Sequence, residues 1–131
     1  MVSSDFQYIK YEKFFYPLIP VRIARSETSL EIHTLIDSGA VISIFKSEVA
    51  DYLGIPIDRG ERRTSTGISG PITVYIHNLK LQVFDKEFEC KIAFSRQLKS
   101  RFNILGRDGF FDRHTITFDE KIKKITITEA D

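Results

Sequence analysis

The sequence predicts a single-domain, all-β protein that is mainly antiparallel and contains one or two short helices. The chain has 131 residues, the usual length of one domain, so residues 1–131 are expected to fold as one unit. Its apolar residues come in short clusters rich in β-branched types, and turn-forming residues separate these clusters. Neither the composition nor the hydropathy pattern suggests a long helix, a repeat or a linker.

The first half of the chain is expected to begin with a β-hairpin. Residues 18–23 and 30–36 form its two strands, and the polar residues between them form the turn. The second strand runs directly into the quartet Asp-Ser-Gly-Ala at 37–40, whose residue types favour turns. The remaining strands are expected at 62–66 and 72–76 around a glycine-bearing tip, at 79–84, 88–94 and 102–105, and at 115–118 and 122–128.

Two helices are expected, and both are short. The first covers residues 46–53, with Ser47 as its N-cap and Gly54 directly after its last residue. The second covers residues 107–113, after the strand that ends at Leu105. This minor helical content keeps the prediction in the all-β class.

The charge balance and the cysteine count exclude several protein classes. Nineteen basic and 18 acidic side chains leave a net charge of +1, so the chain has no overall field that attracts nucleic acid. Cys90 is the single cysteine and cannot form an internal disulfide, which favours a reducing, cytoplasmic location. The sequence shows no signal-peptide pattern and no apolar run of about 18 residues, so we expect no membrane partner.

The histidines and the cysteine do not suggest metal or cofactor chemistry. His33, His77 and His114 have no cysteine or carboxylate companions at ligand spacing, so we expect no metal and no cofactor. Cys90 has no neighbouring histidine to activate it, and a packed, unreactive thiol is expected.

Two turns place a glycine and an ionisable side chain directly after an apolar strand. They are Leu35-Ile36-Asp37-Ser38-Gly39-Ala40 and Ile104-Leu105-Gly106-Arg107-Asp108. Each turn alone is typical of an ordinary solvated loop. The order of the motifs along the chain is more informative than either turn alone, because the glycine-bearing tip Gly67-Ile68-Ser69-Gly70 lies between the two turns.

This ordered set resembles the retropepsins, the single-lobe aspartic proteases of retroviruses and their cellular relatives. The resemblance covers about residues 18–118 and leaves 1–16 as an N-terminal extension. It implies a closed β-barrel of the acid-protease type, with one lobe per chain, and the activity of an aspartic endopeptidase. Asp37 would be the catalytic residue, and Ser38 would link the two active-site loops by hydrogen bonds.

The resemblance also implies roles for other residues. Gly39 and Ala40 would complete the active-site loop, and Gly67-Ile68-Ser69-Gly70 would form the flap that closes over the substrate. Ala40, Ile44, Ile68 and Ile104 would line substrate pockets, which predicts apolar residues on either side of the cleaved bond. Leu105, Gly106 and Arg107 would support the loop that carries Asp37.

Carboxylate chemistry adds a constraint on the assembly. Peptide hydrolysis by carboxylates needs two of them close enough to share one proton, and the chain supplies one such loop. Arg107 in the other turn is permanently cationic and cannot be the partner. An active enzyme must therefore be a homodimer. In this dimer, Asp37 of each subunit would help to activate a water molecule that attacks a peptide bond of a peptide or protein substrate. Sharing a proton also predicts that turnover favours acidic or mildly acidic conditions.

Other interpretations stay open. Val41 stands where many retropepsins carry an acidic residue that pairs with the arginine of the second turn, so Arg107 needs another partner such as Asp108 or Asp112. A catalytically weak or inactive dimerisation or peptide-binding module of the same fold is therefore the alternative function. A nucleic-acid surface on the basic hairpins around 59–63 and 121–124 is a second alternative, although these hairpins lack interleaved aromatic residues.

The N-terminal segment is rich in aromatic residues. We expect them to cover one end of the barrel, with a contact to a second subunit or another partner as the alternative. These residues are Tyr8, Tyr11, Phe14, Phe15 and Tyr16.

Overall fold

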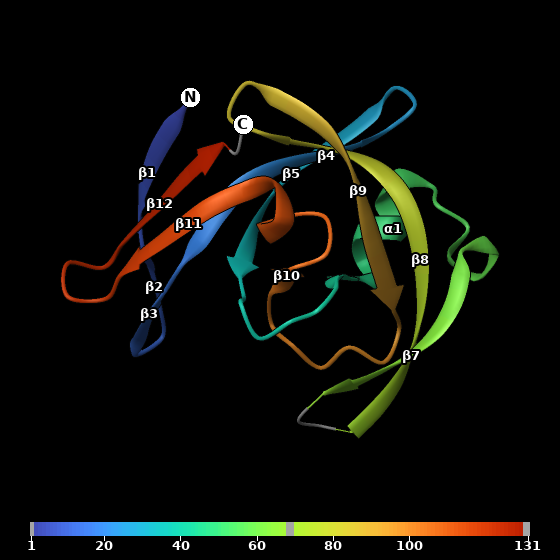
Figure 1. Cartoon of the computed structure of the whole chain (residues 1–131). Coiled ribbons are helices and arrows are strands. Elements are labelled where there is room, and N and C mark those ends of the chain that lie inside the picture. The colour runs from blue at the N-terminus through green and yellow to red at the C-terminus, as the bar shows by residue number, and fades with distance from the viewer. Residues whose placement is uncertain (1, 68–69, 130–131) are drawn as a thin grey trace.

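The computed structural model describes residues 2–67 and 70–129, and its centre is a closed ring of strands (Figure 1). In order around the ring, the strands are β4 (Leu18–Arg25), β5 (Thr28–Ile36), β10 (Asn103–Leu105), β6 (Ser43–Lys46), β9 (Lys86–Ser95) and β8 (Gly70–Val83). The ring closes because β4 pairs with both β5 and the second half of β8. The β5–β10 and β6–β9 pairs are parallel and the other pairs are antiparallel.

A hairpin ribbon made of β7 (Glu61–Gly67) and the first half of β8 extends from this ring; because it carries the predicted flap, it is called the flap ribbon below. β7 pairs with the first half of β8 from Glu61↔Ile76 to Gly67↔Gly70. β8 is one continuous strand, whereas the sequence suggested separate strands at 72–76 and 79–84. The two halves have different partners, because the first half pairs with β7 and the second with β4. Ile68 and Ser69, which were predicted for the flap tip, lie outside the described residues.

A second, smaller sheet joins the two ends of the chain. β1 (Ser3–Gln7) pairs with β12 (Lys124–Glu129), which also pairs with β11 (His114–Asp119). β2 (Ile9–Tyr11) and β3 (Phe14–Tyr16) form a separate hairpin. Sequence patterns did not predict these three N-terminal strands, because β1 depends on a partner at the far end of the chain and the other two are very short.

The helices differ from the sequence prediction in two respects. Helix α1 (Ser47–Leu53) begins at Ser47, so Ser47 is not its N-cap; Lys46 takes that position without a side-chain cap. Gly54 ends the helix in the left-handed conformation, as predicted. The expected helix over 107–113 is reduced to the 3₁₀ turn η2 (Phe111–Arg113), because Gly109 has a φ of 97° and interrupts helical geometry.

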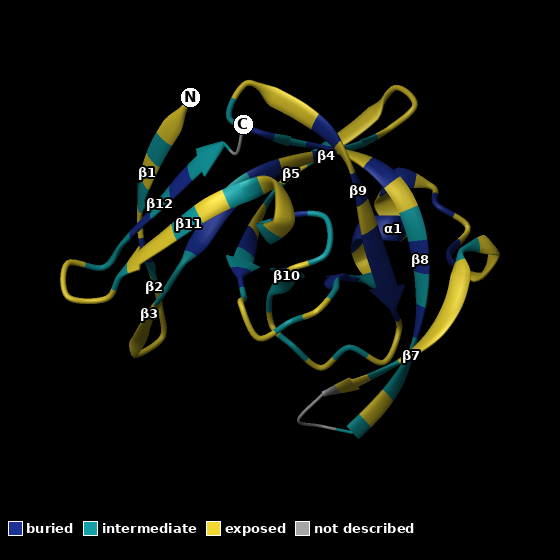
Figure 2. Cartoon of the chain, in the orientation of Figure 1, coloured by how far each residue is buried: buried dark blue, intermediate teal, exposed yellow. Residues whose placement is uncertain are grey.

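The core fills the inside of the ring and continues beneath the small sheet. Figure 2 shows buried residues along the strands of the ring and exposed residues on many of the turns. Phe45, Phe94 and Phe110 are among the largest fully buried side chains. A further short 3₁₀ turn, η1 (Ile57–Arg59), packs Ile57 into the core. No helix within residues 2–67 and 70–129 is long and apolar enough to cross a membrane.

Candidate active site

Asp37 lies directly after β5, beside the end of its parallel neighbour β10. Its backbone N–H donates to the Leu105 carbonyl at 3.0 Å, which extends the pairing of the two strands by one residue. Its carboxylate oxygen Oδ1 accepts the Gly39 N–H at 2.9 Å, and its carbonyl accepts the Ala40 N–H at 3.2 Å. The half-buried carboxylate is therefore oriented by its own turn before any ligand binds.

The chain after this turn wraps around the second predicted turn. The Arg107 N–H donates to the Ala40 carbonyl at 2.9 Å, and the Asp108 N–H donates to the Val41 carbonyl at 2.8 Å. Ile42 and Asp108 then form an isolated parallel bridge. The two turns that the sequence analysis paired are thus in direct backbone contact, although 69 residues (106 − 37) separate them.

Gly106 makes this close crossing possible. A Cβ atom there would lie 2.5 Å from the Ile42 carbonyl oxygen and 2.7 Å from the Ala40 carbonyl oxygen. The Gly106 N–H donates to the hydroxyl of Ser43, which is fully buried. The sequence analysis did not identify Ser43; the available signal was a hydroxyl residue inside the apolar run Ile42-Ser43-Ile44-Phe45.

Asn103 is a second residue that the sequence analysis left without a role. Its side-chain Oδ1 accepts the Lys46 N–H at 2.8 Å and so connects the start of β10 with the end of β6. Asparagine suits this place, because its side-chain amide oxygen can accept a hydrogen bond from a backbone N–H. The position therefore stabilises the strand that leads into Gly106.

The polar side chains of the two turns face solvent. Ser38 is exposed, and its hydroxyl makes no hydrogen bond to the rest of the described chain. Arg107 is also exposed and forms no ion pair within residues 2–67 and 70–129, so the expected pairing with Asp108 or Asp112 is not found. Asp112 instead accepts the Gly109 N–H with both carboxylate oxygens at 3.1 Å.

The predicted pocket residues lie on the adjoining strands. Ile44 and Ile104 are directly opposite each other in the β6–β10 pair. Ile44 is buried in a small apolar cluster with Val74, Ile76 and Ala93, whereas Ile104 is half-buried. Ile72, which pairs with Ser65 near the tip of the flap ribbon, packs against the same cluster. An apolar surface therefore connects the flap ribbon with the strands that carry the Asp37 turn.

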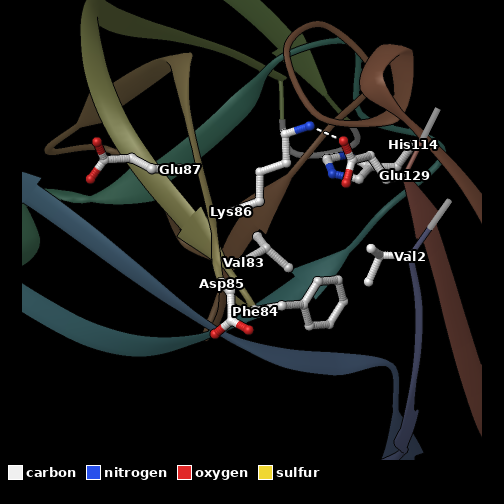
Figure 3. A pocket seen from close by; sticks show the side chains of 8 residues that line it. All are labelled: Val2, Val83, Phe84, Asp85, Lys86, Glu87, His114 and Glu129. Carbon is white, nitrogen blue, oxygen red and sulfur yellow. Dashed lines mark hydrogen bonds and ion pairs between the residues drawn. The ribbon is translucent and has the colours of Figure 1, made fainter. Parts of the chain in front are cut away.

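A hollow of about 340 Å³ lies elsewhere, between the small sheet and the β8–β9 turn (Figure 3). The Lys86 ammonium group bonds to the Glu129 carboxylate across it. Burial lowers the pKa of His114 at its edge, although the ring Nδ1–H donates to the Phe110 carbonyl at 2.8 Å. None of the predicted site residues lines this hollow, so it is separate from the candidate active site.

The remaining sequence hypotheses concern the thiol, metals and basic hairpins. Cys90 is buried, and burial raises the pKa of its thiol to about 12, which keeps the thiol protonated and unreactive. No three histidine, cysteine or acidic side chains converge within the described part of the chain.

In Figure 1, β7 and the β11–β12 turn lie on opposite sides of the molecule, so their basic residues do not form one surface.

Comparison with solved structures identifies this architecture. A retropepsin-like aspartic protease from Rickettsia conorii matches 94% of this chain and 98% of its own, with a TM-score of 0.70 and 17% identity. The chain has the retropepsin-like fold. EIAV protease, in complex with the inhibitor HBY-793, matches 79% of this chain and 93% of its own, with a TM-score of 0.55 and 21% identity. No protein-family model and no curated protein matches the sequence.

The retropepsin-like fold confirms the predicted fold class and the family resemblance. The short helical content also agrees, since α1 is accompanied only by two 3₁₀ turns within the described residues. At these identities the likeness establishes the fold alone. The chemistry of the site must therefore be argued from the residues of this chain.

Proposed function

We propose that this chain is a homodimeric aspartic endopeptidase of the retropepsin type. The observation that carries the proposal is the Asp37 turn, whose carboxylate is oriented by the Gly39 N–H where β5 and β10 end side by side in a retropepsin-like fold. The sequence of this turn is a common one, so the proposal is supported by its oriented carboxylate together with the fold in which it lies. Since the second turn presents Gly106 and Arg107, the second carboxylate has to come from another copy of the chain.

The two Asp37 carboxylates would share one proton across the two-fold axis. The ionised carboxylate removes a proton from a water molecule, and the water oxygen attacks the peptide carbonyl carbon. The protonated carboxyl group donates its proton to the carbonyl oxygen. Collapse of this tetrahedral intermediate breaks the C–N bond: the leaving nitrogen takes the proton that was removed from the water, the other Asp37 carboxylate regains its proton from a hydroxyl of the intermediate, and a carboxylic acid and an amine are released.

The substrate would be an extended peptide that lies between the flap ribbon and the Asp37 turns. Strand-like pairing of the peptide backbone supplies affinity that does not depend on the peptide's sequence, and pockets for alternate side chains supply the preference for particular residues. Ala40, Ile44, Ile68 and Ile104 are apolar, so cleavage is expected between apolar residues. Ser38 and Arg107, exposed in the single chain, would find their partners in the dimer or with substrate. A reducing, cytoplasmic compartment fits the single cysteine.

The decisive test is the substitution Asp37→Asn, which keeps the shape of the turn and removes the charge. Peptidase activity on a library of apolar and charged peptides is expected to fall at least about 100-fold, because the general base is lost. Asp58→Asn, at an exposed turn with no assigned role, is the matched control and should keep full activity. Circular dichroism would show that both variants are folded.

A mixing experiment tests the shared site directly. Adding an excess of Asp37→Asn chain to a constant amount of unmodified chain should lower activity, since mixed dimers contain a single catalytic carboxylate. Full activity in the mixture, or hydrolysis by the Asp37→Asn chain alone, would show that the proposal is wrong. Tight peptide binding without cleavage by the unmodified chain would favour the alternative peptide-binding module.

A further inference from the structure

The five aromatic residues from Tyr8 to Tyr16 fall into two groups. Tyr8 belongs to the core, and its hydroxyl donates to Glu120 Oε2 at 2.9 Å. Tyr16 is half-buried against Phe102, with ring centroids 5.0 Å apart. The other three lie on the β2–β3 hairpin, where the relative exposures are 42% for Tyr11, 67% for Phe14 and 46% for Phe15. These three rings keep much of their surface exposed in the single chain.

The hairpin that carries them is held firmly in place. The Arg101 guanidinium pairs with Glu12 at 2.7 Å and lies over the Tyr11 ring at 5.5 Å. The Phe102 ring contacts Tyr11 edge-on at 5.4 Å. The exposed rings therefore form a preorganised surface, which lowers the entropy cost of binding. The same contacts connect the hairpin to the segment that leads directly into β10.

The hairpin also lies on the side of the molecule where the second subunit must come. In Figure 1 the hairpin, the loop after β5 and the flap ribbon all point to the lower side of the view, and Figure 2 shows the hairpin turn exposed. Two Asp37 carboxylates can meet only if this side of each copy faces the other. Val41, next to the Asp37 turn, adds an apolar side chain that is 60% exposed.

The terminal strands are already occupied within the chain. β1 pairs with β12 of the same chain over its whole length, from Ser3↔Thr128 to Gln7↔Lys124. An interface between copies therefore cannot use exchange of these two strands while this pairing holds. The β2–β3 hairpin, in contrast, pairs only within itself in the described structure.

We propose that the β2–β3 hairpin docks on a second copy of this chain through Tyr11, Phe14 and Phe15, and that this contact brings the two Asp37 turns together. The inference rests on the proposed homodimeric function and specifies which surface builds it. Aromatic side chains are the residues expected at such a contact, because they bury a large area at low entropy cost. The hairpin is thus a positioning element of the active site.

Substitution of the exposed rings tests the interface. The double variant Phe14→Ser/Phe15→Ser should raise the dimer Kd at least about 30-fold in sedimentation equilibrium, as loss of a central aromatic contact does. Activity per chain should fall at low concentration and recover at high concentration. Tyr52→Ser/Ile122→Ser removes two side chains of 61% and 54% exposure elsewhere and should leave both quantities unchanged.

A fluorescence probe locates the contact even if the double variant folds poorly. The chain contains no tryptophan, so Phe14→Trp introduces a unique reporter. Its emission should shift to the blue with the same concentration midpoint as dimerisation, whereas the emission of Tyr52→Trp should not shift. A dimer in which the Phe14→Trp emission does not shift, together with an unchanged Kd in the serine variant, would overturn the hairpin inference while leaving the proposed function intact. A chain that remains monomeric at every concentration would overturn both.

Discussion

Gly106 shows how one residue determines the geometry of the candidate site. Its backbone passes so close to the Ala40 and Ile42 carbonyls that no side chain fits between them. The contact belongs to the crossing of two loops, so the clash cannot be relieved by moving a flexible side chain. The requirement for glycine here is steric, and φ is not in the left-handed region.

Replacement of this glycine should therefore be costly. Gly106→Ala is expected to lower the free energy of unfolding by about 3 kcal/mol, because the crossing loops must move apart. Gly39→Ala is the control, since its Cβ would meet only the Asp37 Oδ1 at 3.2 Å, and its stability loss should be small. Urea unfolding followed by circular dichroism measures both. Equal losses in the two variants would contradict the steric argument.

At the scale of elements, β10 has a role out of proportion to its length. It spans only Asn103–Leu105, yet it joins β5 on one side and β6 on the other, and without it the ring has a gap beside Asp37. The Asn103 side chain adds a hydrogen bond to Lys46, the N-cap residue of α1. One short strand thus connects the Asp37 turn, β6 and α1.

Removal of the Asn103 amide should loosen this junction. Asn103→Ala is expected to lower the free energy of unfolding by about 1–2 kcal/mol, because the partly buried Lys46 N–H loses its acceptor. Hydrogen exchange followed by NMR should show faster exchange of the Lys46 amide. Asn78→Ala, at an exposed position of β8, should change neither quantity. Unaltered exchange at Lys46 would mean that the bond does not support the junction.

At the scale of the whole molecule, the structure consists of a ring that positions the site and a small sheet that binds the chain ends together. The seam between them contains the hollow of Figure 3, the Lys86–Glu129 ion pair and His114. The His114 ring stacks on Phe110 with centroids 4.6 Å apart. A neutral imidazole fits this place, since burial lowers its pKa and the cations Arg113 and Lys86 act in the same direction.

This environment predicts a pH dependence of stability. The unfolded chain binds a proton at His114 near its ordinary pKa of about 6.5, whereas the folded chain binds it only at lower pH. The contribution of neutral His114 to the free energy of unfolding is complete above the pKa of the unfolded state. It is lost as the pH falls through about 6.5 toward the lower pKa of the folded state. His114→Phe should flatten the change in urea midpoint between about pH 7 and 5. His33→Gln, at an exposed position, should leave the pH dependence of the urea midpoint as it is in the unmodified chain. If His114→Phe also leaves this pH dependence unchanged, His114 is not its source.

Much of the candidate site could be predicted from local sequence because local chemistry dictates it. Asp, Ser and Gly form a turn wherever they follow an apolar strand, and Gly106 was noticed because a glycine follows another such strand. Ser43 and Asn103 were missed, since each acts on a backbone N–H far away in the chain. The expected helix over 107–113 was wrong because the Arg107 and Asp108 N–H groups donate to the Ala40 and Val41 carbonyls, in addition to the interruption at Gly109.

The sequence by itself determined the β class, the hairpins at 18–36, 62–76 and 115–128, the end of α1 at Gly54 and the order of the motifs that resembles the retropepsins. The strands, these hairpins and the helix end depend on residues that are neighbours along the chain, where propensity and patterning act directly. Only the tertiary structure decided that β4 meets β8, that β1 meets β12, that the Asp37 turn crosses Gly106, and that three aromatic rings stay exposed. These outcomes depend on contacts between distant segments, because burial and strand pairing are settled by the whole chain at once.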